Sequence, residues 1–106
     1  MLLITDLLTS ITIKPDDTAT STEPTYEVSY VDTVGYDKNP GSNVGSLTGA
    51  TAVEMVAAMS GDAMAREVVG INVYNADSVT RTITVYKKKS STSYPLCAIV
   101  LASGDS

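Results

Sequence analysis

The stretch Val79-Thr80-Arg81-Thr82-Ile83-Thr84-Val85-Tyr86-Lys87 decides the fold class, because hydroxyl-bearing side chains alternate along it with mostly aliphatic ones. A repeat of two residues places the two sets on opposite faces of a β-strand. β-Branched residues such as these also favour strands. We therefore expect a strand over residues 79–87 with one face in the core and a ladder of threonines on the other, suited to an exposed or interface face.

The flanking sequence predicts two further strands. Residues 66–74 place Val69, Ile71 and Val73 on one face, and a turn at residues 75–78 separates them from the central stretch. A reversal at residues 88–93 then leads into an apolar strand at residues 94–102. These three segments predict an antiparallel meander at the C-terminal end of the chain.

The N-terminal half predicts two strands, at residues 7–14 and 26–34, separated by a polar loop at residues 18–24. Residues 35–49 are dense in Gly, Asn, Asp, Pro and Ser and predict a long loop. Such a loop is either a contact element or a plain crossover between two sheets. Residues 51–59 fit both a short helix and a strand, and the β-rich surroundings favour the strand.

These segments predict one all-β domain over residues 1–106, a single antiparallel β-sandwich or jelly-roll-like domain with a C-terminal meander. A chain of 106 residues can bury one modest core. Phe and Trp are absent, so aliphatic residues must fill that core.

The charge of the chain disfavours nucleic acid as a partner, because a net charge of −5 repels phosphate backbones. The basic run Lys87-Lys88-Lys89 is interpreted as a solvated hairpin tip, with a phosphate or capsid-charge contact as the alternative. The start Met1-Leu2-Leu3-Ile4-Thr5-Asp6 lacks the basic region of a signal peptide, and no apolar stretch reaches the length of a membrane span. We expect synthesis in a cytoplasm and no membrane partner.

The residue types needed for catalysis are sparse. The chain has no His and a single Cys, Cys97, which lies in an apolar run and is expected to be a small buried hydrophobic residue. No base is present to activate a serine at residues 60–62 or 103–106. We therefore expect no enzyme, and we assign no catalytic, cofactor-binding or metal site.

The acidic residues are scattered. Asp16 and Asp17 form the one adjacent pair and are interpreted as turn residues after Pro15. Asp32, Asp37 and Asn39 could meet at a calcium ion, although their spacing is loose.

The six tyrosines are expected to supply bulk at the edge of the core, with a sugar-stacking face as the alternative. They are Tyr26, Tyr30, Tyr36, Tyr74, Tyr86 and Tyr94.

The ends of the chain predict contact elements. The C-terminal segment Ser103-Gly104-Asp105-Ser106 is a turn after the last strand, so one sheet edge is expected to be open to a partner. We expect residues 1–8, residues 35–49 and the C-terminal tail to contact other subunits.

Four stretches of the sequence resemble a group of small structural proteins of tailed-bacteriophage particles. They are Met1-Leu2-Leu3 with the strand after it, Tyr26-Glu27-Val28-Ser29-Tyr30-Val31-Asp32, Ala50-Thr51-Ala52-Val53-Glu54-Met55-Val56-Ala57-Ala58, and residues 71–85 with their continuation at residues 98–105. The resemblance covers most of the chain, but none of its motifs is chemically specific.

The resemblance implies a virion protein made in the host cytoplasm, and a capsid decoration (cement) protein in particular. Its expected partners are the major capsid protein or other virion subunits, and it is expected to form a homo-oligomer. A connector in the neck, tail or a fibre is an alternative within the virion. A carbohydrate-binding adhesin module is an alternative of another class.

Overall fold

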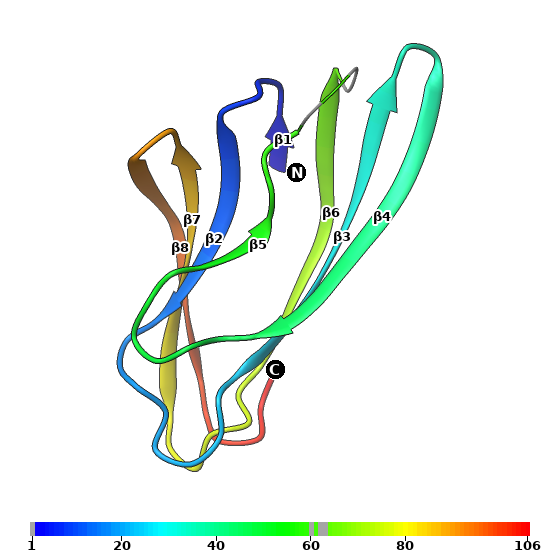
Figure 1. The fold of residues 1–106 in the computed structure, drawn as a ribbon. Helices are drawn as coiled ribbons and strands as arrows, with labels where there is room; N and C mark the ends of the chain where they lie inside the picture. Colours follow the sequence, from blue (N-terminus) through cyan, green and yellow to red (C-terminus); the bar gives the residue numbers. More distant parts are fainter. Residues whose placement is uncertain (1, 60, 62–63) are drawn as a thin grey trace.

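In the part of the chain that the structure describes, eight strands form two four-stranded antiparallel sheets that pack face to face as a sandwich (Figure 1). This computed structural model describes residues 2–59, 61 and 64–106 of the chain. The first sheet has the order β1 (Leu2–Ile4), β6 (Ala65–Tyr74), β3 (Thr25–Val34) and β4 (Asp37–Ser46). The second has the order β5 (Val53–Val56), β2 (Thr9–Pro15), β7 (Arg81–Lys89) and β8 (Thr92–Leu101). The predicted all-β sandwich is confirmed.

No helix long and apolar enough to cross a membrane occurs in residues 2–59, 61 and 64–106.

The predicted C-terminal meander is only partly present. The hairpin β7–β8 forms as expected, but β6 lies in the opposite sheet and pairs with β3. Residues 75–80 carry the chain across the end of the sandwich. The core explains the crossing, because the apolar faces of β6 and β7 meet from opposite sides and cannot do so as neighbours in one sheet.

The core lies between the sheets and is almost entirely aliphatic. Ile11, Ile13 and Ile83 of the second sheet and Val28 of the first are fully buried. Burying a side chain of this kind contributes about 1.5–3 kcal/mol. The remaining buried apolar side chains are Ile4, Tyr26, Leu47, Met55, Val56, Met59, Val68, Val73, Val85 and Leu101.

The predicted loop at residues 35–49 is wrong, because most of it forms β4. Gly35, with φ of 61°, makes the tight turn from β3. Gly41 and Gly45 then lie opposite Tyr30 and Tyr26. A Cβ atom at either glycine would lie 2.7 Å from a tyrosine atom. These two glycines therefore make room for cross-strand rings, whereas the sequence alone suggested a flexible segment.

Several strand boundaries also differ from the prediction. β2 begins at Thr9, two residues late, and Leu7 and Leu8 are exposed. β7 begins at Arg81 and continues through the three lysines, so the hairpin tip is Ser90-Ser91. The strand favoured at residues 51–59 is confirmed over Val53–Val56. Ser60 and Asp62 of the expected turn lie outside the described residues.

Register shifts interrupt three strand pairings of the described residues: β2–β5 at Met55, β3–β6 and β7–β8. The register between β3 and β6 shifts so that Val69 is an extra residue, and the register between β7 and β8 shifts at Leu96. Val69 is 63% exposed, so it does not share the burial of Val73, with which the two-residue repeat grouped it. A bulge cannot be read from a two-residue repeat, because it breaks that repeat.

Candidate binding surfaces

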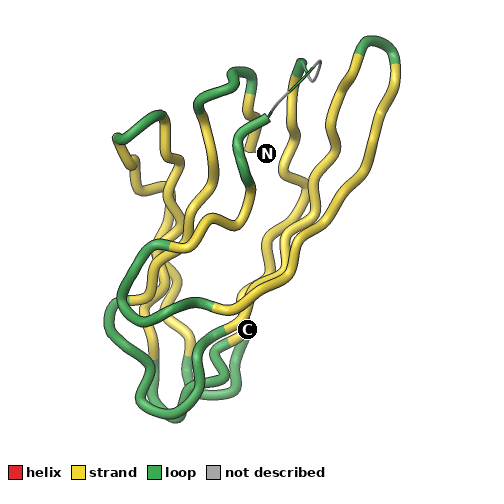
Figure 2. The backbone as a smooth tube through the Cα atoms, viewed as in Figure 1, coloured by secondary structure: helices red, strands yellow, loops and turns green. Residues whose placement is uncertain are grey.

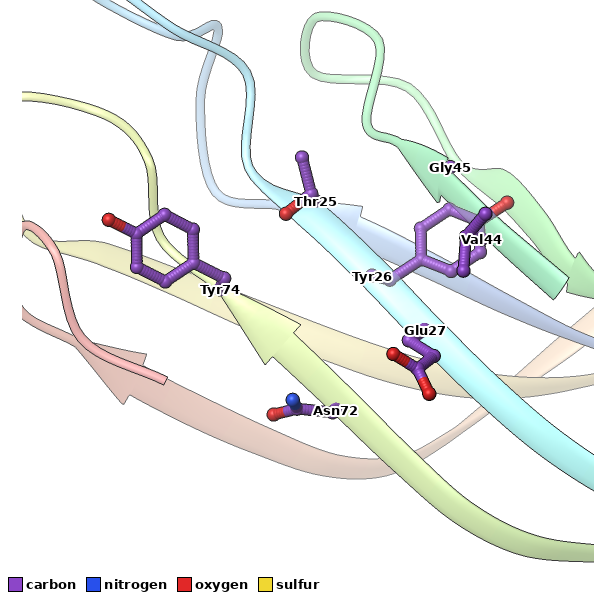
Figure 3. Close-up of a pocket in the computed structure, with 7 residues that line it drawn as sticks. All are labelled: Thr25, Tyr26, Glu27, Val44, Gly45, Asn72 and Tyr74. Atoms are coloured by element: carbon purple, nitrogen blue, oxygen red, sulfur yellow. The ribbon is translucent and has the colours of Figure 1, made fainter. Parts of the chain in front are cut away.

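A hollow of about 400 Å³ lies on the outer face of the first sheet (Figure 3). Its floor is a cross-strand row in which Glu27 of β3 lies between Val44 of β4 and Asn72 of β6. Tyr74 and Thr25 form the adjacent pair. Glu27 is the one charged residue in the lining, so the hollow offers a carboxylate, an amide, a hydroxyl and a half-exposed aromatic ring.

A second surface, here called the open side, lies where the sandwich ends at β8 and at the free half of β6. β1 pairs with β6 only from Arg66 to Val68, and among the described residues no strand continues the pairing along residues 69–74. β8, at the same side of the second sheet, therefore has little of the first sheet opposite it. The result is a groove of about 320 Å³ with apolar walls, lined by Leu2, Val68, Val69, Gly70, Ile71, Val85, Leu96 and Cys97.

The bulge residues of β6 and β8 line this groove. Val69 projects from β6 and Leu96 from β8, and they are 63% and 45% exposed. Bulges concentrate at sheet edges, where they redirect a side chain. Here they place two large apolar side chains at the rim of the groove, where both remain exposed to solvent.

The expected burial of Cys97 is wrong. Cys97 lies opposite buried Val85 of β7, so the two side chains face the same side of the sheet. Cys97 is nevertheless exposed. The reason is the missing strand opposite β8, since an inward-facing side chain at an uncovered edge remains in contact with solvent.

Two of the expected contact elements are parts of the fold. Residues 2–4 form β1, Ile4 is fully buried, and the Asp6 carboxylate accepts hydrogen bonds from the Leu8 amide and the Thr9 hydroxyl. The C-terminal tail is also held, because the Asn75 amide donates to the Asp105 carbonyl at 2.8 Å. Neither segment is a free arm.

A buried polar cluster at the lower end of the sandwich was not predicted. Figure 2 shows that long loops gather at this end. The carboxylate of Asp77 accepts hydrogen bonds from the amides of Thr20 and Ser21 and from Arg81 Nε, at 2.9, 2.8 and 2.8 Å. Asn75 donates from Nδ2 to the Val79 and Leu101 carbonyls, each at 2.9 Å. The cluster therefore ties together three segments that are distant in sequence.

These contacts change the acidity of Asp77. Burial alone raises the pKa of a carboxyl group, but the donated hydrogen bonds outweigh it and hold the pKa of Asp77 well below its ordinary value. The sequence did contain a signal. Arg81 lies in the inward-facing phase of its strand, and a guanidinium there needs a carboxylate partner.

The upper end carries a second polar contact. Arg66 makes a two-pronged ion pair with Asp32, at 2.6 and 2.8 Å, and its guanidinium lies 4.5 Å from the centre of the Tyr30 ring. The hydrogen bonds from Arg66 lower the pKa of Asp32. Both carboxylate oxygens of Asp32 therefore accept hydrogen bonds from Arg66.

Three other candidate residues, Asp16, Asp17 and Lys87, make contacts within the fold. Asp17 accepts a hydrogen bond from the Thr18 amide, as expected of a turn, and Asp16 lies 3.7 Å from Arg81. Lys87 donates to the Leu3 carbonyl across the sheets at 3.2 Å. Within the described ranges, no three His, Cys, Asp or Glu side chains are placed to share a metal ion.

In comparisons with known proteins, no family model, no curated protein and no solved structure matches this chain.

Proposed function

We propose that this protein is a non-enzymatic structural module of a tailed-phage particle, and that it binds the outer shell of the capsid as a decoration protein. The open side carries the proposal. The resemblance of the sequence to small virion proteins is the reason for proposing a phage particle. The open side is the reason for proposing that the protein binds another protein.

The open side suits a protein partner for two reasons. Val69, Leu96 and Cys97 expose apolar surface in a groove whose lining contains no charged residue. Grouped exposed apolar residues of this kind favour protein contacts. The backbone of β6 also presents unpaired groups along residues 69–74, which an extended segment of a capsid subunit can pair with.

The mechanism is additive binding. Each copy bridges neighbouring capsid subunits through a modest interface, and many copies act on one shell. Because each copy binds the assembled state and not the separated subunits, the contacts shift the equilibrium toward the intact shell.

The first experiment is a quantified protein inventory of purified particles. Hundreds of copies per particle would support the shell, and absence from the particle would overturn the proposal. About a dozen copies or fewer would instead support a neck, tail or fibre connector, which is the alternative within the virion.

The second experiment tests the surface. Val69→Glu places a charge in the groove and should lower occupancy on undecorated capsids by about tenfold or more. Val44→Glu is the matched control, because Val44 is 69% exposed on the far face of the first sheet and should not affect occupancy. Equal occupancy for both variants would exclude the groove as the capsid contact.

The hollow around Glu27 supports a second candidate, a carbohydrate-binding adhesin module. A carboxylate and an amide beside an exposed tyrosine ring can bond sugar hydroxyls and stack on a sugar face. A glycan array with the wild type and with Tyr74→Ala separates the two functions. Binding that Tyr74→Ala removes would favour the adhesin, and an array with no binding would dismiss it.

A further inference from the structure

We infer that the free edge of β8 pairs with β8 of a second copy of this chain, antiparallel and about a two-fold axis at Ile99. The inference deepens the proposed function, because it names the partner of the β8 edge. It rests on the proposed function only for the claim that the protein acts on a phage particle. The pairing uses the backbone edge of β8, whereas the groove is lined by side chains of this strand.

The hydrogen-bond phase of β7 identifies the free groups of β8. The Asp16 amide donates to the Thr82 carbonyl at 2.9 Å, and the Ser90 amide donates to the Leu8 carbonyl at 3.0 Å. Even-numbered residues of β7 therefore bond toward β2, and odd-numbered residues bond toward β8. The β8 partners of those odd-numbered residues include Cys97, Ile99 and Leu101.

The alternate residues of β8 face outward. Ala98 and Val100 turn both N–H and C=O away from β7. Pro95 has the same orientation, so its lack of an N–H removes no hydrogen bond to β7. The Ala102 carbonyl accepts from the Asp105 amide at 3.0 Å, so the free edge ends there.

These groups are self-complementary in one register. When Ala98 lies opposite Val100 of the second copy, each residue donates and accepts once, and the two-fold axis repeats the pair. All four N–H and C=O groups of the two residues then find partners. Pro95 on one flank and the C-terminal turn on the other prevent a longer or shifted ladder.

The side chains permit this contact. β8 carries no charged residue along its ten positions, although the whole chain has a net charge of −5. The other long edge, β4, carries Asp37, Lys38 and Pro40, which are residues that protect an edge from pairing.

The charges around β8 favour the antiparallel direction. Lys88 and Lys89 lie beside its N-terminal end, paired with Ser93 and Thr92. Around its C-terminal end, three carboxylates (Asp16, Asp77 and Asp105) outnumber Arg81, the residue that pairs with Leu101. A two-fold dimer places the basic end of each copy beside the acidic end of the other.

The mass in solution is the direct test. Sedimentation from about 1 μM to 1 mM should show a concentration-dependent change from 11.1 kDa to twice that mass. A monomer throughout this range overturns the inference. If that monomer still decorates particles, the proposed function stands without the dimer. A dimer that is absent from particles would support the inference about β8 and overturn the proposed function.

Two proline variants test the edge. Ala98→Pro removes one outward N–H and should abolish the dimer. Ser93→Pro is the matched control, because Ser93 has the same orientation but lies beyond Pro95 and outside the ladder. A dimer that survives Ala98→Pro overturns the inference.

Disulfide trapping tests the register without relying on the proline variants. In a Cys97→Ser background, Ile99→Cys should form a covalent dimer on mild oxidation, because position 99 faces itself across the axis. Val100→Cys in the same background should not, since position 100 faces position 98. The opposite result overturns the register.

A charge exchange tests the direction. Lys88→Glu should weaken the dimer several-fold, and adding Asp105→Lys should restore part of the loss. No effect from either change would mean that the end charges do not select the antiparallel arrangement.

Discussion

The two long sides of the sandwich are built differently. On the side of β4 and β5, bonds join the sheets, because Asn43 donates from Nδ2 to the Met55 carbonyl at 3.0 Å and the Tyr26 hydroxyl to the Glu54 carbonyl at 3.5 Å. On the open side, a half-buried lysine, Lys87, reaches across to the Leu3 carbonyl. The first side is closed by the chain itself, and the second leaves apolar groups exposed.

The comparison separates residues that hold the fold from residues that remain free to bind. On the closed side, Tyr26, Met55 and Val56 are buried and should affect stability when changed. The exposed Val69 and Leu96 on the open side contribute less to the fold, and under the proposed function they contact another subunit.

Acid should have the largest effect, because it acts on the polar clusters at both ends of the sandwich. The folded protein holds the pKa of Asp77, Asp32 and Asp6 below their ordinary values, so the unfolded chain binds more protons near pH 4. This stability should be fully present above about pH 5 and decrease as the pH falls below about 4. Urea denaturation at a series of pH values measures it.

The control for this prediction is Asp77→Asn, which cannot ionise. It should lower the unfolding temperature at pH 7 and reduce the loss of stability on acidification. An acid response equal to that of the wild type would show that Asp77 is not the main source.

A pair of truncations compares the two sides directly. Met55→Ala on the closed side removes a fully buried side chain and should lower the free energy of unfolding by about 3 kcal/mol. Leu96→Ala on the open side removes a side chain that is 45% exposed and should cost about 1 kcal/mol or less. Equal losses in urea denaturation would contradict the distinction.

A pair of glycine substitutions makes the same comparison with one added methyl group. In Gly45→Ala the new Cβ would lie 2.7 Å from the buried Tyr26 hydroxyl, so about 1–3 kcal/mol of stability should be lost. Gly70, at the open groove, has no atom within 4 Å of the same position. Gly70→Ala should therefore be neutral or slightly stabilising.

Amide hydrogen exchange should give the smallest but most local effect. In dilute protein, the amides of Ile99 and Leu101 should be protected by β7, while those of Ala98 and Val100 should exchange faster. At high concentration the dimer should slow the exchange of Ala98 and Val100. Uniform exchange along β8 at both concentrations would contradict the open edge.

The sequence predicted the strands wherever a two-residue repeat was unbroken, as in β3 and β7. It failed at β4, where Gly41 and Gly45 suggested a loop. The reason is that their role depends on Tyr30 and Tyr26, which lie on the neighbouring strand. It missed the candidate groove, because Val69 and Leu96 are placed by bulges that interrupt the local pattern.

Local side-chain chemistry thus determined that this chain forms strands, that its core is aliphatic, and that histidine chemistry is absent from it. Tertiary structure decided which sheet each strand joins, that Cys97 is exposed, and which side of the sandwich stays open. Alternation along a strand is set by its own residues. The burial of either face depends on whether another strand lies opposite, and for β8 the short β1 leaves that place uncovered.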